Sequence, residues 1–336
     1  MLIIDFGFHF KQMIHASYYW GRSDTVLLSN DEELNKGNFD RIHRFKTKFS
    51  ALKILMLMFF YLIKGERVVV LTAPEYGERR YDELVRLIFA FICMIFGKKI
   101  DLYIKNTHVY IGNNYLYKCI EYVDTIHFES KTQLDYFFSK VEINKNKCRV
   151  TYVYYPNIHT VDESVSAALV LKKDKINIGL VGQFDSERRE YEKLYSLGAD
   201  FYDKYRLVQI GRIRKDHFKT QCDYKNFKCN GMIMFIKDDY CTRELDFLLS
   251  QCDMLISFNS PNFNYDKGKG TAVFSEAISH KKKLLVPNFL PQASEFSNFC
   301  DTFDKNLEQS INQLNIRTVS SSVWNQYSVE SVRLEK

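Results

Sequence analysis

The sequence predicts an α/β protein built from two successive domains, each with a parallel β-sheet covered by helices. Short apolar runs rich in β-branched residues alternate with helical patterns along the whole chain, as in βαβ units. The length of 336 residues suits two domains of about 150 residues each. A charged stretch, HTVDESVSAALVLKKDK, separates the halves. We therefore expect domains at 1–158 and 159–318, with a C-terminal tail at 319–336 that can cross back to the first domain.

The apolar runs give the expected elements in order. In the first half we expect helices near 8–20, 46–63, 81–96, 113–122 and 131–140. The strands expected there are Leu2–Phe6, Thr25–Ser29, Arg67–Thr72, Ile100–Ile104, Thr125–Phe128 and Val150–Tyr154. In the second half the expected strands are Asn177–Val181, Arg206–Ile210, Gly231–Ile236, Met254–Phe258 and Leu284–Pro287.

Composition restricts the class of protein. A hydrophobic content of 46% with 15% aromatic residues excludes disorder. The eight cysteines form no CxxC pair and no metal-ligand spacing. The N-terminal MLIIDFGFHF shows neither the basic segment nor the cleavage site of a signal peptide. We expect a protein of the reducing cytoplasm.

Two helical segments are unusually apolar, ILMLMFFYLI at 54–63 and LIFAFICMIF at 87–96. Each is half of the ~20 residues that a membrane span needs. The net charge is +6, and basic residues flank the first segment: Arg41, His43, Arg44, Lys46, Lys48, Lys53 and Lys64. One interpretation is a helix buried between sheet and neighbours. The other interpretation is peripheral contact of residues 41–64 with an anionic membrane. We expect no nucleic-acid partner.

Several motifs of well-known chemistry are absent. The chain has no GxGxxG, no GxxxxGK[ST] and no HExxH, and we see no paired His/carboxylate cluster. Asp5-Phe6-Gly7 spells a kinase tripeptide, but the other kinase motifs are missing. We therefore expect no bound cofactor and no metal.

The loops that follow the strands of the second half are the candidate ligand sites, because ligands of open α/β sheets bind at the carboxyl ends of the strands. The loop that begins at Gly182 carries Arg188 and Arg189. Either guanidinium could hold a diphosphate, and the alternative is a solvated start of the next structural element.

The segment DKGKGTAVFSEAISHKKKLLVP, residues 266–287, predicts a glycine-bearing loop, a short helix and a buried strand. A helix N-terminus after such a loop favours anions. Glu276, about one turn into the helix, could accept hydrogen bonds from sugar hydroxyls. Phosphate and diol recognition together suggest a nucleotide-sugar site, and the alternative is an ordinary loop–helix–strand unit.

The order of these motifs resembles the GT-B family of retaining glycosyltransferases, of the family 4-like type of bacterial polysaccharide synthesis. INIGLVGQFDSERREYEKL, YRLVQIG, MIMFIKDDYCTRELDFLLSQCDMLISFNSPNF and GKGTAVFSEAISHKKKLLVP are similar to successive elements of its donor-binding domain. VDTIHFESKTQLDYFF and KCRVTYVYYPNI are similar to the end of its first domain. The resemblance implies two Rossmann-like domains facing across a cleft, the first binding the acceptor and the second the nucleotide sugar.

The resemblance also implies roles for individual residues. Glu276 matches the glutamate that binds the nucleotide ribose, Arg188 the cation beside the diphosphate, and His108 the histidine that faces the donor sugar. The implied donor contacts are Gly182, Gln183, Arg188, Ile236, Lys237, Lys269, Gly270, Thr271 and Glu276. Acceptor contacts are expected from loops of the first domain, at His9, Glu75, Arg79 and Arg80.

Two positions depart from the family pattern. The residue eight before Glu276, where the family has a second glutamate, is Gly268. The family has an arginine after the first glycine of the donor-binding domain; in this chain that glycine is Gly182, and the next residue is Gln183. The resemblance implies metal-independent sugar transfer with retention to a glycan or lipid-linked glycan, in O-antigen or capsule synthesis on the cytoplasmic side of the membrane. The alternatives are a non-catalytic GT-B-like binding or scaffolding protein and a nucleotide-sugar epimerase.

Overall fold

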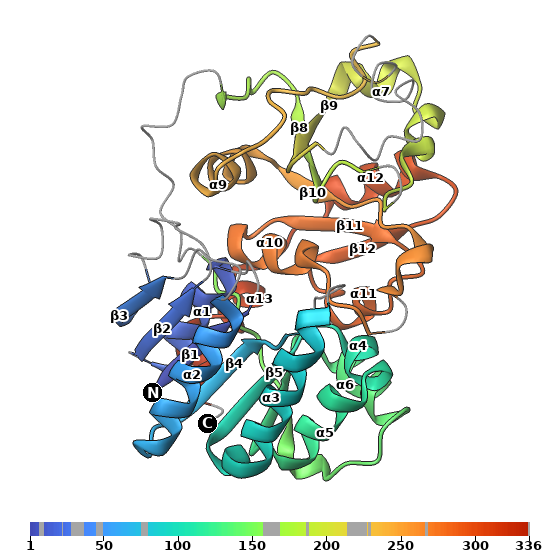
Figure 1. Cartoon of the computed structure of the whole chain (residues 1–336). Helices are drawn as coiled ribbons and strands as arrows, with labels where there is room; N and C mark the ends of the chain where they lie inside the picture. The colour runs from blue at the N-terminus through green and yellow to red at the C-terminus, as the bar shows by residue number, and fades with distance from the viewer. Residues whose placement is uncertain are drawn as a thin grey trace. The chain divides into compact units, whose positions relative to one another are not determined.

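The computed structural model describes residues 1–6, 10–21, 23–27, 37–44, 50–74, 80–156, 169–185, 188–213, 227, 230–265 and 268–334. The chain divides into two compact units (Figure 1). Residues 1–154, 267–270 and 329–336 form the first unit, and residues 155–266 and 271–328 form the second. The chain therefore leaves the first unit and returns to it twice.

The first unit contains a seven-stranded parallel sheet in the order β3-β2-β1-β4-β5-β6-β7. Its central strands β1, β4 and β5 are buried at every residue, as expected for a parallel sheet covered on both faces. The strands are β1 Leu2–Asp5, β2 Ser23–Leu27, β3 Phe39–Arg44, β4 Val68–Thr72, β5 Ile100–Ile104, β6 Thr125–Phe128 and β7 Cys148–Val150.

Helices connect these strands. They are α1 Phe10–Trp20, α2 Ser50–Ile63, α3 Arg80–Phe96, α4 Thr107–Gly112, α5 Asn114–Tyr122 and α6 Lys131–Phe138. The C-terminal helix α14, Val329–Leu334, contacts α1. Polar caps start several of them: Asn113 accepts from the N–H groups of the first turn of α5, and Ser130 accepts from the Gln133 N–H of α6.

The second unit contains a five-stranded parallel sheet in the order β12-β11-β10-β8-β9. Its strands are β8 Ile176–Val181, β9 Tyr205–Ile210, β10 Met254–Ile256, β11 Lys283–Pro287 and β12 Cys300–Phe303. Its α-helices are α7 Ala199–Lys204, α9 Thr242–Gln251, α10 Ala272–His280, α11 Gln292–Glu295, α12 Leu307–Ile316 and α13 Ser321–Asn325. A 3₁₀ helix, η5, spans Tyr191–Ser196.

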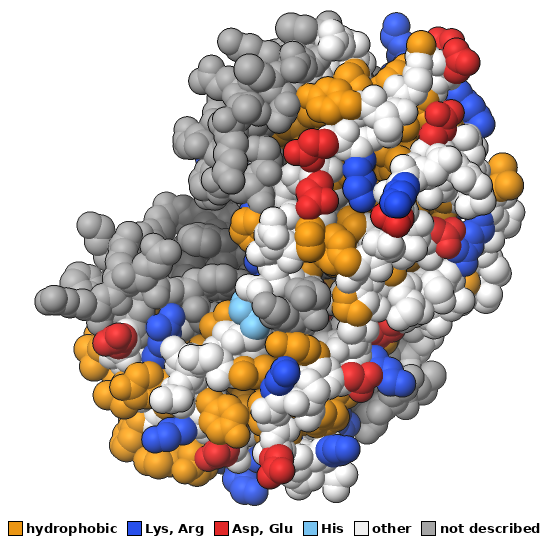
Figure 2. All heavy atoms as spheres, turned by 90° about the vertical axis from the view of Figure 1, so that its right-hand side faces the viewer, with side chains coloured by type: hydrophobic (Ala, Val, Ile, Leu, Met, Phe, Trp, Pro, Cys, Tyr) orange, Lys and Arg blue, Asp and Glu red, His pale blue; other side chains and the backbone are white. Residues whose placement is uncertain are grey.

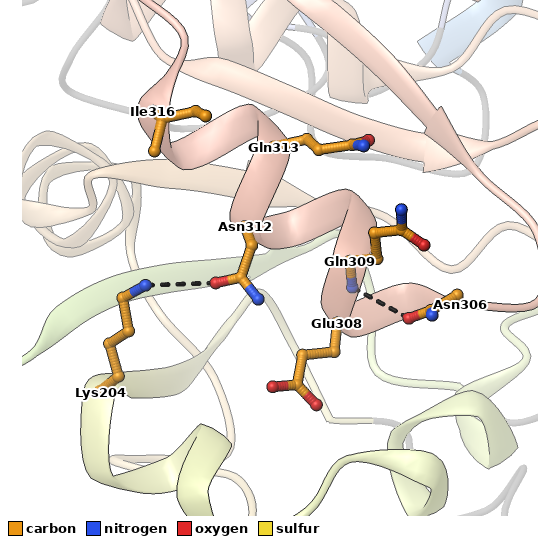
Figure 3. A pocket seen from close by; sticks show the side chains of 7 residues that line it. All are labelled: Lys204, Asn306, Glu308, Gln309, Asn312, Gln313 and Ile316. Atoms are coloured by element: carbon orange, nitrogen blue, oxygen red, sulfur yellow. Dashed lines mark hydrogen bonds between the residues drawn. The ribbon is translucent and has the colours of Figure 1, made fainter.

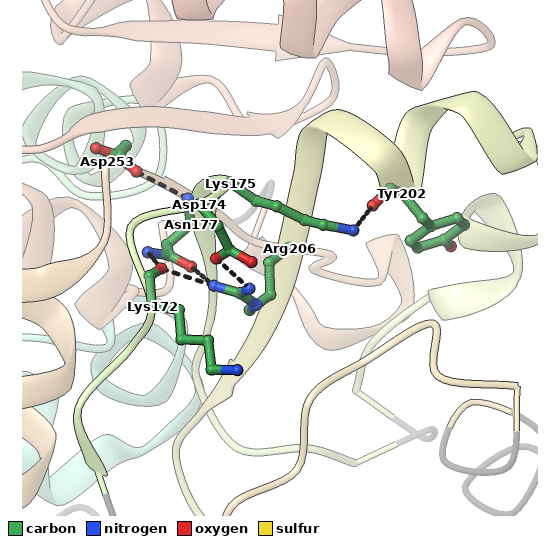
Figure 4. A network of polar contacts seen from close by, with 7 residues as sticks. All are labelled: Lys172, Asp174, Lys175, Asn177, Tyr202, Arg206 and Asp253. Carbon is green, nitrogen blue, oxygen red and sulfur yellow. Dashed lines mark hydrogen bonds and ion pairs between the residues drawn. The ribbon is translucent and has the colours of Figure 1, made fainter. Parts of the chain in front are cut away.

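A polar network fastens the amino ends of the strands in the second unit (Figure 4). The Arg206 guanidinium donates to the Lys172 carbonyl at 2.7 Å and to Asn177 Oδ1 at 3.0 Å, and it lies 2.6 Å from Asp174 Oδ1. The Asn177 N–H donates to Asp253 Oδ2 at 2.7 Å. These contacts join the starts of β8, β9 and β10 at the edge opposite the strands' carboxyl ends.

The predicted α/β fold with two parallel-sheet domains is confirmed, and most strands begin and end within two residues of the predicted positions. The prediction of a strand at Gly231–Ile236 is wrong, because only Met234 pairs there, in a single bridge to Val208. The last strand of the first sheet is Cys148–Val150 rather than Val150–Tyr154. Two edge strands, β3 and β12, were not predicted; β3, FDRIHR, has only two apolar residues, three positions apart, which does not fit the alternation typical of a strand.

Candidate functional site

The candidate site lies at the carboxyl edge of the second sheet, between β8 and β10. These strands are neighbours, while β9 lies on the far side of β8. The chain order therefore reverses at this point, and such a topological switch point is where open parallel sheets bind ligands. The loops that leave β8 and β10 here contain residues 182–190 and 257–265.

Backbone contacts join these two loops. The Glu190 N–H donates to the Phe258 carbonyl at 2.8 Å, and the Ser260 N–H donates to the Arg188 carbonyl at 3.0 Å. Arg189 forms an isolated antiparallel bridge with Asn259. The two predicted arginines are thus held by a paired backbone at the switch point.

Gly182 is required at the end of β8 for two reasons. Its φ of +99° lies in the region that side chains disfavour. A Cβ at this position would also lie 2.4 Å from Arg189 Nη2. The glycine therefore lets the guanidinium of Arg189 approach the backbone.

Arg189 is a buried charged group of this edge with unmet hydrogen-bond donors. The residue is only 7% exposed, and its Nε and Nη1 atoms have no hydrogen-bond partner among the residues that the structure describes. A buried guanidinium with unmet donors costs free energy unless an anion joins it. This position is therefore suited to an anionic ligand.

Arg188, which the sequence pattern assigned to the diphosphate, has protein partners. Its Nη2 lies 3.3 Å from the Tyr265 hydroxyl, and its guanidinium lies over the Phe263 ring, 5.7 Å from the centroid. Both partners belong to the loop after β10. Arg188 is thus held at the switch point beside the more deeply buried Arg189.

Helix α10 brings Thr271 and Glu276 into the second unit. Thr271 is the N-cap, and its side chain makes no capping hydrogen bond. The first-turn N–H groups of α10 thus donate no hydrogen bond to the cap side chain, and such unpaired donors favour anions. The partly exposed Glu276 carboxylate lies on the next turn.

Glu276 belongs to a group of three side chains with Asp246 of α9 and His280 of α10. His280 Nε2 lies 3.2 Å from Asp246 Oδ1 and 3.8 Å from Glu276 Oε2. In the part of the chain that the structure describes, this is the one group with three ligand atoms within 4.8 Å that could hold a metal ion. This His/carboxylate cluster was not expected from the sequence, although the i,i+4 spacing of Glu276 and His280 was a signal for it.

The loop with Ile236 and Lys237 is fixed by side-chain contacts. Lys237 Nζ lies 2.6 and 2.7 Å from the two carboxylate oxygens of Glu244, and the Glu244 carboxylate accepts from the Cys241 N–H. Tyr240 donates its hydroxyl to Gln209 Oε1 at 3.2 Å. The contact of Ile236 and Lys237 with a nucleobase stays a prediction. Gln183, another predicted donor contact, lies in the loop after β8 and is half-buried.

The loop 268–270 lies in the first unit, although its sequence placed it with the donor site. The Gly270 N–H donates to the Lys105 carbonyl at 2.9 Å, and the Gly268 carbonyl accepts from Thr107 Oγ1 at 2.6 Å. Lys269 forms an antiparallel bridge with Asn106. The amide N–H of Gly270, one of the expected donor contacts, therefore has a protein acceptor.

Gly268 also has no room for a side chain. Its φ is +71°, and a Cβ would lie 2.1 Å from Thr107 Oγ1. The second glutamate of the GT-B pattern cannot occupy this position in the observed backbone. His108 is the residue after Thr107 and the second residue of α4, and it is partly buried.

The predicted acceptor residues fall largely outside the described part of the chain. His9, Glu75 and Arg79 are not among the described residues, and of Arg80 only the backbone, at the start of α3, is described. The strands that precede them, β1 and β4, are neighbours at the switch point of the first sheet. Their roles stay predictions.

A surface cavity of about 670 Å³ runs along α12 (Figure 3). It is lined by Lys204, Asn306, Glu308, Gln309, Asn312, Gln313 and Ile316. None of the predicted site residues is among them. The Lys204 Nζ donates to Asn312 Oδ1 at 3.2 Å, so the cation has a partner within the cavity wall.

The fold is the GT-B fold of solved glycosyltransferases. The Anabaena protein Alr3699/HepE in complex with UDP and glucose matches with a TM-score of 0.67 and 11% identity, over 99% of this chain and 97% of that one. The N-terminal domain of Candida albicans trehalose-6-phosphate phosphatase matches with a TM-score of 0.61 and 11% identity, over 99% and 94%. An α,α-trehalose-phosphate synthase (UDP-forming) from Burkholderia xenovorans matches with a TM-score of 0.55 and 11% identity, over 99% of this chain and 98% of that one. No protein-family model and no curated protein sequence matches the chain.

Proposed function

We propose that the chain is a glycosyltransferase that uses a nucleotide-sugar donor. The buried Arg189 guanidinium with two unmet donors carries this proposal, because it lies at the topological switch point of the second sheet. The first-turn amides of α10 supply a second anion-binding feature in the same unit. Solved structures with the same fold are complexes with UDP and with UDP-glucose, so UDP-glucose is the first donor to test.

In this proposal the second unit binds the donor. Arg189, with Arg188 beside it, neutralises the diphosphate, and this stabilises the charge that develops on the leaving group. Glu276 accepts hydrogen bonds from the ribose hydroxyls. The roles that the resemblance gives to His108, Lys269 and Thr271 in binding the donor stay part of the proposal. Gly270 stays a proposed donor contact, and its own amide N–H donates to the Lys105 carbonyl.

The finer description follows the resemblance seen in the sequence. We propose transfer with retention, without a metal, to a glycan or lipid-linked glycan on the cytoplasmic side of a bacterial membrane, as part of surface-polysaccharide synthesis. His9, Glu75, Arg79 and Arg80 are the proposed acceptor contacts. They follow strands β1 and β4, which meet at the switch point of the first sheet.

Binding of UDP and UDP-glucose to the purified chain tests the donor site by calorimetry. Arg189→Lys keeps the charge but loses the planar fork, and we expect about 10- to 100-fold weaker binding. Arg206→Lys is the matched control, since Arg206 lies in the network at the opposite edge of the sheet. Equal affinity of Arg189→Lys and wild type would contradict the site, and no binding of any UDP-, GDP-, ADP-, dTDP- or CMP-sugar would contradict the function.

The geometry at Gly268 favours a second candidate, a protein that binds a nucleotide sugar without transferring it. The clash of any Cβ with Thr107 excludes the second carboxylate of the family pattern from this position. Release of UDP from UDP-glucose distinguishes the two candidates. Turnover that Glu276→Ala abolishes supports the transferase, whereas tight binding without turnover supports the binding protein.

A further inference from the structure

Helices α2 and α3 expose large apolar side chains on the surface that faces away from their sheet. On α2 these are Met56, Phe59, Phe60 and Ile63, and on α3 they are Leu84, Leu87, Phe91, Met94 and Ile95, each 40–67% exposed. We call these nine residues the α2–α3 face. Figure 2 shows hydrophobic side chains gathered at the lower left, in the first unit, with both basic and acidic side chains beside them.

The α2–α3 face is continuous and larger than an ordinary apolar patch. The two helices contact each other, and the Phe59 and Phe96 rings meet edge to face with centroids 5.4 Å apart. Nine side chains of about 200 Å² each, half exposed, give on the order of 900 Å² of apolar surface. The largest patch of a typical monomer is about 300–600 Å², so this face marks an interaction site.

The inner sides of both helices already have their partner. Ile54, Met58 and Leu62 of α2 and Phe89 and Cys93 of α3 are fully buried in the core of the first unit. The apolar character of the outer sides is therefore not needed for packing against the sheet. A helix that is apolar all round requires an apolar environment on both sides.

The charges around the face indicate a lipid surface. No acidic residue occurs at 50–65 or at 84–100, and the exposed Glu83 is the acidic residue next to Leu84 on α3, while Lys53, Lys64 and Lys98 are exposed on or next to the two helices. The Lys64 ammonium lies 4.2 Å from the centroid of the Phe60 ring, so its charge stands next to the apolar surface. Interfaces between proteins are depleted of lysine. Lysines that border an apolar helix face are typical of binding to anionic membranes.

We propose that the α2–α3 face is a docking surface for an anionic lipid bilayer, in which the two helices lie in the interface and the lysines contact lipid phosphates. No helix of the described chain is long and apolar enough to cross a membrane. The proposal differs from the sequence-based expectation for residues 41–64, because residues 39–44 form the edge strand β3 and α3 contributes more of the surface. It does not depend on the proposed enzymatic function.

Flotation of the full chain with phosphatidylcholine vesicles, with and without phosphatidylglycerol, tests the proposal. We expect binding to the anionic vesicles and at least about tenfold weaker partitioning of the triple variant Met56→Ser/Ile63→Ser/Phe91→Ser. Lys64→Gln and Lys98→Gln should each weaken binding about fivefold at low salt. Ile316→Ser is the matched control, because Ile316 is 81% exposed but lies on α12 of the second unit.

A second measurement keeps the test valid if the triple variant does not fold. In Phe91→Trp the new indole should be quenched by brominated lipid, whereas in Ile316→Trp it should not. The proposal is overturned if wild type does not float with anionic vesicles, or if the triple variant floats equally well. A wild-type dimer that the triple variant dissociates, without vesicle binding, would overturn it too and would assign the face to a second copy of the chain.

Discussion

Helix α2 of the first unit and helix α12 of the second pack alike on their inner sides and differ on their outer sides. Both bury an apolar stripe against a parallel sheet, formed by Ile54, Leu55, Met58 and Leu62 in α2 and by Leu307, Ile311 and Leu314 in α12. The outer side of α2 exposes Phe60 and Ile63, whereas that of α12 exposes Gln309 and Gln313 and one apolar residue at its end, Ile316. Packing against the sheet requires an apolar inner stripe in both helices. The residues on the outer sides are free of this requirement and can differ between the two units.

Core truncations should give the largest effect and should treat the two helices equally. Met58→Ala in α2 and Ile311→Ala in α12 each remove a fully buried side chain, and we expect a loss of about 2–5 kcal/mol in the free energy of unfolding. Phe60→Ser, on the exposed side of α2, should change it by less than about 0.5 kcal/mol. Urea unfolding measures all three. A comparable loss in Phe60→Ser would show that the outer side of α2 contributes to the fold.

Gly182→Ala should damage the second unit only. The new Cβ would meet Arg189 Nη2 at 2.4 Å, and the φ of +99° strains any side chain, so we expect a loss of about 1–3 kcal/mol and weaker nucleotide binding. Gly112→Ala in the first unit is the control, because a Cβ there would meet no neighbouring atom within 4 Å. Thermal unfolding of both variants measures the loss of stability, and titration with UDP measures the change in nucleotide affinity. Unchanged UDP affinity in Gly182→Ala would separate the glycine from the ligand site.

Helix caps should contribute equally in the two units. Ser130 Oγ accepts from the Gln133 N–H at the start of α6, and Asn306 Oδ1 accepts from the Gln309 N–H at the start of α12. Replacing either cap by alanine should cost about 1 kcal/mol. Chemical denaturation of the two variants provides the comparison. A difference of more than about twofold would indicate that one helix depends on packing and the other on its cap.

Glu129→Gln should have the smallest effect, and one that depends on pH. Burial raises the pKa of Glu129 above its ordinary value of 4.5, and the nearby Lys105 charge opposes that shift. The unfolded chain therefore releases this proton at lower pH than the folded chain, so stability falls as pH rises above 4.5. The glutamine cannot titrate and should be more stable than wild type at about pH 7, but not at about pH 4. Melting temperatures at both pH values test this, and an equal difference at both would contradict it.

The periodicity of the sequence was sufficient for the fold class and for the strands at the centre of each sheet. Ile100–Ile104 and Thr125–Phe128 begin and end as predicted, because strands buried on both faces are rich in apolar and β-branched residues. The edge strands β3 and β12 were not predicted, since only pairing with a neighbour makes their mixed sequences strands. The apolar run at 231–236 was misread for the same reason, as only Met234 finds a strand partner.

The order of amino acids was enough to specify which residue types follow β8, namely Gly182 and the two arginines, and that Glu276 lies on the helix before β11. Their surroundings followed from the folded chain alone, because burial and pairing depend on segments that are distant in sequence. Folding buries Arg189 beside the loop after β10, joins Glu276 to Asp246 and His280, and places residues 268–270 in the first unit. It also leaves the apolar segments 54–63 and 87–96 buried on one side only, since a hydrophobic pattern does not specify how many of its sides the fold will cover.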